Sequence, residues 1–60
     1  MTLRKQASKV INDYVEHFEG NWKDVRKEVL RDVDFLFRHG TDGAKLYAYA
    51  LDAVYHEMKP

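Results

Sequence analysis

Residues 22–40 read WKDVRKEVLRDVDFLFRHG, and the spacing of their apolar side chains decides the fold class. These side chains recur every three or four positions, which places them along one side of an α-helix that turns about 100° per residue. Asn21 is a suitable N-cap, and residues 38–40 supply a basic last turn and a glycine stop. We therefore predict a helix over 22–39 with an inward stripe of Trp22, Val25, Val29, Leu30, Val33, Leu36 and Phe37.

The same spacing predicts a helix on each side of this one. Thr2 is a suitable N-cap for the first helix, Gly20 has the backbone freedom to end it, and Thr41 or Asp42 caps the third. The inward residues are Leu3, Ala7, Val10, Ile11, Tyr14, Val15 and Phe18 in a helix over 3–19, and Ala44, Tyr47, Leu51, Val54, Tyr55 and Met58 in a helix over 42–58. Because the connections are short, consecutive helices should lie side by side and roughly antiparallel. The chain is thus expected to form one compact all-α domain, a three-helix unit over 1–60.

The composition excludes several classes of protein. The 60 residues include no cysteine, which removes disulfide bridges and thiolate zinc sites. Ten Lys and Arg balance ten Asp and Glu, so the chain lacks the net positive charge that supports broad binding to nucleic acid or to anionic lipid. No apolar run approaches the roughly 18 residues of a membrane span, and the N-terminal residues lead into no signal-peptide core. We therefore expect a cytoplasmic protein that binds no membrane and has little affinity for nucleic acid.

Catalysis is not expected. A catalytic site needs a nucleophile, a base and an orienting group that converge in a cavity, and three short helices rarely enclose one. The only hydroxyl side chains besides tyrosine belong to Thr2, Ser8 and Thr41, and two of these are better explained as helix caps. We predict that the chain is not an enzyme and needs no cofactor.

Two pairs of a carboxylate and a histidine are the candidate metal ligands. Asp13 and His17 stand four residues apart, as do Asp52 and His56, so the members of each pair share a helix face. Neither pair has the second histidine that makes a helical zinc motif specific. We interpret both as solvated ion pairs and predict no metal site.

A helix-turn-helix-like DNA-binding regulator is an alternative, because three helices in about 60 residues are typical of that motif. Its recognition helix must present several polar or basic side chains to bases and phosphates. The third predicted helix instead has a mixed outer side of Lys45, Tyr49, Asp52, His56, Glu57 and Lys59. This alternative therefore ranks below protein binding, as does a role as a structural assembly subunit.

Charged side chains on the helix over 22–39 form two rows of opposite sign. Like charges four residues apart repel, and cross-row pairs three residues apart attract by a similar amount, so the rows nearly cancel in energy. They form either a solvated surface or a stripe that fixes the register against another helix. The acidic row is Asp24, Glu28 and Asp32, and the basic row is Lys23, Lys27 and Arg31.

Two groups of apolar residues are left over once the inward stripes are assigned. Phe35 points about 140° away from the centre of its stripe, beyond Glu28 and Asp32. The third helix has a second apolar edge formed by Leu46, Tyr49, Ala50 and Ala53. Contiguous exposed apolar area usually marks an interface. We therefore predict that partners are bound by Phe35, Glu28, Asp32, Arg31, Leu46, Tyr49 and Ala53.

The small size of the chain favours self-association and a binding role. A domain of this length hides only about 60% of the surface of its unfolded chain, and C2 dimers are the commonest oligomers. We expect a helical homodimer in which the second apolar edges meet. The expected function is protein–protein interaction, as a stoichiometric regulator or inhibitor of a larger protein. Its size and lack of cysteine are typical of phage and mobile-element products that block a host enzyme or a defence protein.

Overall fold

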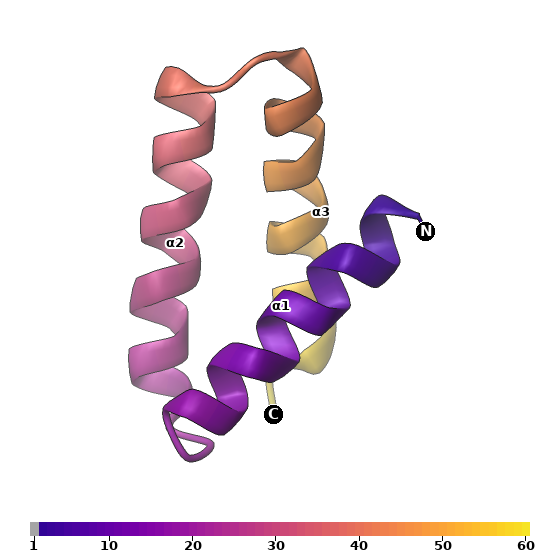
Figure 1. Cartoon of the computed structure of the whole chain (residues 1–60). Coiled ribbons are helices and arrows are strands. Elements are labelled where there is room, and N and C mark those ends of the chain that lie inside the picture. Colours follow the sequence, from indigo (N-terminus) through magenta and orange to yellow (C-terminus); the bar gives the residue numbers. More distant parts are fainter. Residues whose placement is uncertain (1) are drawn as a thin grey trace.

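Three helices joined by short turns form the structure, a computed structural model that describes residues 2–60 (Figure 1). α1 spans Leu3–His17, α2 spans Trp22–His39 and α3 spans Asp42–Met58. No strand occurs in the described residues, and the all-α, three-helix prediction is confirmed. None of the three helices is long and apolar enough to cross a membrane.

Each helix is preceded by a polar N-cap residue, as the sequence predicted. Its side-chain oxygen accepts a hydrogen bond from a backbone N–H of the first turn. Of the two candidates for the third cap, Thr41 takes the position. The bonds run from the N–H of Lys5 to Thr2 Oγ1 (3.2 Å), from the N–H of Lys23 to Asn21 Oδ1 (3.2 Å) and from the N–H of Ala44 to Thr41 Oγ1 (3.5 Å). These caps set the first residue of every helix.

α1 ends at His17 and not at residue 19, where the sequence analysis placed its end. Phe18 is the C-cap, and Glu19 and Gly20 both adopt left-handed backbone conformations, with φ of 56° and 76°. Such a φ cannot continue a right-handed helix, and glycine is the residue that adopts it most easily. The N–H of Gly20 donates to the carbonyl oxygen of Val15 at 2.7 Å, which closes the helix end.

Gly40 follows α2 because no side chain fits at this position. Its φ of −89° is open to any residue. A Cβ atom there would lie 2.4 Å from the carbonyl oxygen of Leu36 and 2.5 Å from the Cβ of Ala44. The first turn of α3 therefore packs directly against the backbone at the end of α2.

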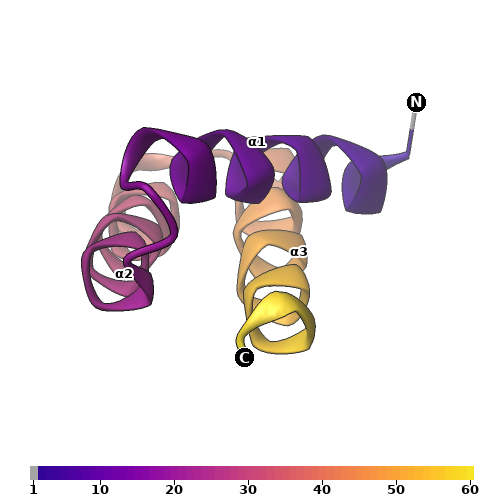
Figure 2. The ribbon, with the colours of Figure 1, turned by 90° about the horizontal axis from the view of Figure 1, so that it is seen from below.

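α2 and α3 form an antiparallel hairpin, and α1 crosses one face of it diagonally (Figure 1). The view from below shows α1 on the same side of both helices (Figure 2). α1 covers the half of this face next to the 18–21 turn and leaves open the half next to the 40–41 turn (Figure 1). The antiparallel prediction thus holds for α2 and α3 but is wrong for α1, because the left-handed residues of the 18–21 turn redirect the chain.

All three inward stripes contribute to the core. Leu3 and Leu30 are exceptions, because they were predicted to face inward and are 41% and 43% exposed. Leu30 lies about 100° around α2 from Val29, at the margin of the stripe. Leu3 lies in the first turn of α1, at the end that projects past α3 (Figure 1). The buried residues, none more than 3% exposed, are Ala7, Ile11, Val25, Val29, Ala48, Leu51, Val54 and Tyr55.

Candidate protein interface

A hollow of about 340 Å³ lies on the face of the hairpin that α1 crosses. All three helices line it, so it exists only in the folded chain. Its lining is apolar or aromatic apart from one carboxylate. The residues of this three-helix hollow are Val10 and Tyr14 of α1, Asp32, Phe35 and Leu36 of α2, and Tyr47 and Leu51 of α3.

Phe35 is the exposed member of the three-helix hollow. It is 61% exposed, and its ring lies against that of His39 with 5.0 Å between the ring centroids. The prediction that Phe35 points away from the inward stripe of its helix is therefore confirmed. The side chain borders the hollow and does not enter the core.

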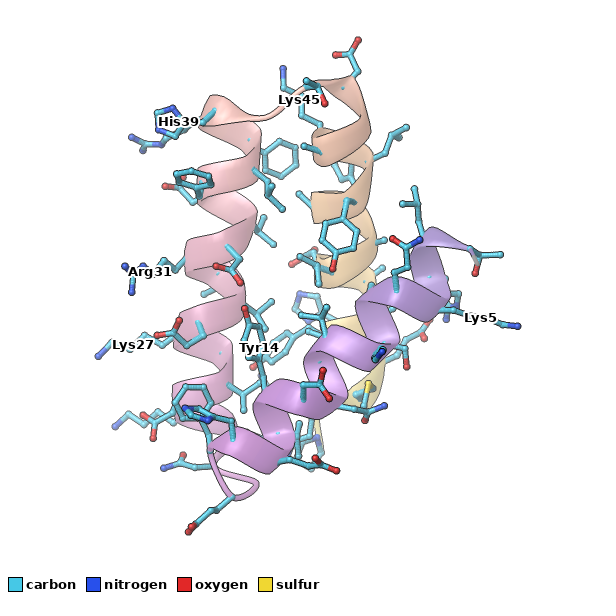
Figure 3. The ribbon with its side chains drawn as sticks, viewed as in Figure 1. Lys5, Tyr14, Lys27, Arg31, His39 and Lys45 are labelled. Atoms are coloured by element: carbon cyan, nitrogen blue, oxygen red, sulfur yellow. The ribbon has the colours of Figure 1, made fainter. Side chains whose placement is uncertain are left out.

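Asp32 ties α2 to α1. Tyr14 reaches from α1 toward α2 (Figure 3), and its hydroxyl donates a hydrogen bond to Asp32 Oδ2. Burial raises the pKa of Tyr14 above its usual value of 10.0, and the bond to Asp32 raises it further. Burial and the Asp32 carboxylate also raise the pKa of Tyr47. Asp32 was predicted to meet a partner, but one of its oxygens is already engaged within the chain.

Glu28 and Arg31 lie on adjacent sides of α2. Glu28 is half-buried on the side of α2 that faces α1. Arg31 is exposed and points away from α1 and α3 (Figure 3), and its Nη1 lies 4.0 Å from Glu28 Oε1. Glu28 belongs to a second hollow of about 630 Å³ lined by Asp13, Tyr14, His17, Phe18 and Glu28. Glu28, Asp32 and Phe35 thus lie on the α1 side of α2, whereas Arg31 lies on its outer side.

The second apolar edge of α3 is exposed at three of its four predicted residues. Leu46 is 58% exposed, Tyr49 is 64% exposed and Ala53 is also exposed. Ala50 is the exception, because it packs against the core. The three exposed residues are termed the α3 edge.

The α3 edge and Phe35 are two separate surfaces. The ring of Tyr49 lies edge-on against Phe37, with 5.0 Å between the ring centroids. Phe37 and Phe35 are two residues apart, so they differ by about 200° around α2 and point to opposite sides. Tyr49 therefore reaches toward the side of α2 that is opposite Phe35.

The two carboxylate–histidine pairs do not join into a larger cluster of metal ligands. Among residues 2–60 there is no group of three His, Cys, Asp or Glu side chains that could hold a metal ion. Asp52 Oδ1 and His56 Nε2 lie 3.5 Å apart near the surface.

One charged surface was only partly identified from the sequence, as the basic row of Lys23, Lys27 and Arg31. Lys23, Arg26, Lys27 and Arg31 are all exposed on the outer side of α2, and the exposed Leu30 lies among them. The full group was not recognised because Leu30 was assigned to the inward stripe and Arg26 was assigned to neither charged row. The spacing 23, 26, 27, 30 and 31 was the available signal, because residues three and four apart share a helix face. These five residues are termed the basic face of α2.

Comparison with protein-family models, with curated proteins and with solved structures found no match to this chain. Its function is therefore inferred from its own surfaces.

Proposed function

We propose that the chain is a small cytosolic protein–protein interaction module that regulates or inhibits a larger protein by stoichiometric binding. The observation that carries this proposal is an exposed aromatic ring, Phe35, at the border of a hollow that three helices build together. Large exposed aromatic residues beside apolar concavities are typical of interface hot spots, which are enriched in aromatic side chains.

The surroundings of Phe35 support a protein as the ligand. Tyr14, Leu36 and Tyr47 offer apolar surface inside the hollow, and Asp32 adds a carboxylate. Glu28, one turn along α2 from Asp32, extends the polar margin. An apolar centre with a polar margin is the usual division of an interface. A partner side chain that enters the hollow would cover Phe35 and gain the free energy of its burial.

We further propose that the α3 edge joins two copies of the chain. Leu46 and Tyr49 provide exposed apolar area, and the small Ala53 allows another helix to approach closely. The two surfaces differ in shape, because Phe35 borders a hollow and the α3 edge follows the outside of one helix. This supports assigning the target to the hollow and the second copy to the edge.

Site-specific photo-crosslinking tests the target proposal. A photoreactive phenylalanine analogue replaces Phe35 in cells that naturally produce the chain, and the same analogue replaces Leu3 as a matched control, because both positions are exposed and apolar. We expect position 35 to give an adduct with one larger protein and position 3 to give none. Adducts that contain only a second copy of this chain, or equal yields at both positions, would contradict the proposal.

A further inference from the structure

The basic face of α2 carries positive charge that the fold does not neutralise. Lys27 and Arg31 point away from α1 and α3 (Figure 3). Arg31 has the carboxylate of Glu28 at 4.0 Å, whereas Lys23, Arg26 and Lys27 form no ion pair within residues 2–60. The net charge of the whole chain is zero, so this face is a local excess.

The same face offers an apolar contact at its centre. Leu30 is 43% exposed, and a shallow hollow beside it is lined by Lys23, Asp24, Arg26, Lys27 and Leu30. Lys and Arg side chains have aliphatic stems that lie along apolar surface while their charged ends stay in water. Leu30 and these stems can therefore receive one apolar side chain, with cations around it.

We infer that the basic face of α2 binds an acidic amphipathic helix of a partner protein. The cations recur at helical spacing, and residues three or four apart on a helix lie about 5–6 Å from one another. A partner helix repeats its carboxylates at the same interval, so charges of opposite sign meet in register around a contact with Leu30. This goes beyond the proposed function, because it concerns residues on a different side of α2 from Phe35.

Acidic neighbours make a DNA duplex a poorer occupant. Asp24 and Glu28 lie beside the basic face along one margin, and Asp34, which pairs with Arg38, continues the same face one turn beyond Leu30. A helix inserted in a DNA groove has a phosphate backbone on each side, and Asp24 and Glu28 would approach the phosphates on one side, whereas Asp34 would face the base edges. A single partner helix contacts only the narrow basic face.

An anionic membrane is also a poor fit, since Leu30 is the one exposed apolar residue of this face that could enter it.

Nuclear magnetic resonance titration of the full chain tests this inference. The probe is a synthetic helical peptide of about 21 residues with Glu at every third or fourth position around one Leu, and the matched peptide has Gln in place of every Glu. At low ionic strength, where charge pairs are least screened, we expect the Glu peptide to shift the amide signals of the basic face of α2. The Gln peptide should bind at least about tenfold more weakly.

Paired charge reversals locate the binding surface. Arg26→Glu combined with Lys27→Glu should weaken binding of the Glu peptide by about tenfold or more, because two attractive contacts become repulsive. The control, Lys9→Glu combined with Lys45→Glu, changes the net charge equally at exposed positions on α1 and α3 and should change the affinity less than about twofold. Circular dichroism checks that both variants remain helical.

Four results would overturn the inference: no binding of the Glu peptide, equal binding of the two peptides, equal effects of the two double variants, or tighter binding of a DNA duplex or of phosphatidylglycerol vesicles than of the peptide. Phe35→Ala should leave the affinity for the peptide within about twofold. The two proposals are therefore tested independently. If the basic face of α2 does not bind the Glu peptide, crosslinking through position 35 is unaffected. If position 35 gives no adduct, binding of the Glu peptide is unaffected.

Discussion

The carboxylate of Asp32 accepts a hydrogen bond from Tyr14 of another helix, although Asp32 was predicted to bind a partner. Their hydrogen bond joins α1 to α2 across 18 positions of sequence and stands beside the three-helix hollow. No helical periodicity relates residues on two different helices, so this contact follows from the crossing of α1 and not from the sequence pattern. The pair should therefore stabilise the crossing as well as shape the hollow.

Tyr14→Phe should lower the free energy of unfolding by about 1 kcal/mol at neutral pH, because it removes one side-chain hydrogen bond that is only part-buried. Asp32→Ala should not add to this loss, since both changes remove the same bond. Urea unfolding of the two single variants and the double variant measures the coupling. Strictly additive losses would show that the bond contributes nothing to stability.

The alkaline stability of the chain should depend on the same tyrosine. The pKa of Tyr14 is raised above 10.0 in the folded chain, so the fold favours the neutral phenol. The resulting stability is complete below pH 10.0 and is lost as the pH rises through the folded pKa. Urea unfolding at a series of pH values above 10.0 should show a smaller decline for Tyr14→Phe than for the wild type. A decline that Tyr14→Phe leaves unchanged would assign it to other groups, such as Tyr47.

At the scale of helices, the sequence predicted that three helices form and where each one begins. It did not predict how α1 is placed against the other two. Caps such as Thr2 and Asn21 are local, so they can be identified in the sequence. A 3.6-residue period gives the direction of the inward stripe but not its width, which is why Leu30 was misassigned. The period also does not predict which of the other two helices packs against each side of that stripe. The three-helix hollow depends on how the helices cross, so only two of its residues, Phe35 and Asp32, were predicted from the sequence as binding residues.

A methyl group should be tolerated at Gly43, in the first turn of α3, but not at Gly40, at the end of α2. Gly40→Ala should lower the free energy of unfolding by about 1–3 kcal/mol, because the added Cβ overlaps Leu36 and Ala44. Gly43→Ala is the matched control: the nearest neighbour of its Cβ is Thr41 Oγ1 at 3.9 Å, and alanine favours the helix by up to about 1 kcal/mol. Thermal melts followed by circular dichroism compare them. Equal stability of the two variants would contradict the close packing described at Gly40.

At the scale of the whole molecule, the small core limits the stability of a single copy. Small domains are commonly stable by only a few kcal/mol, and association adds to that stability by mass action. We therefore expect the melting temperature to rise with protein concentration if two copies join through the α3 edge. Tyr49→Lys should lower the molar mass measured by light scattering to that of one chain, because it places a charge in the contact. Lys substituted for the exposed Leu3 is the control and should leave the mass unchanged. A melting temperature independent of concentration, with a monomer mass for the wild type, would refute the dimer.

We expect Phe35 to serve binding and not folding, and Phe35→Ala tests this when stability and affinity are measured on the same preparation. Because the side chain is 61% exposed, the free energy of unfolding should fall by less than about 1 kcal/mol. Affinity for the protein crosslinked through position 35 should fall by about 2 kcal/mol or more, which is roughly a thirtyfold rise in Kd. A loss of about 3–5 kcal/mol in folding stability would instead mark Phe35 as a core residue. An intact fold with unchanged affinity would equally contradict a binding role for Phe35.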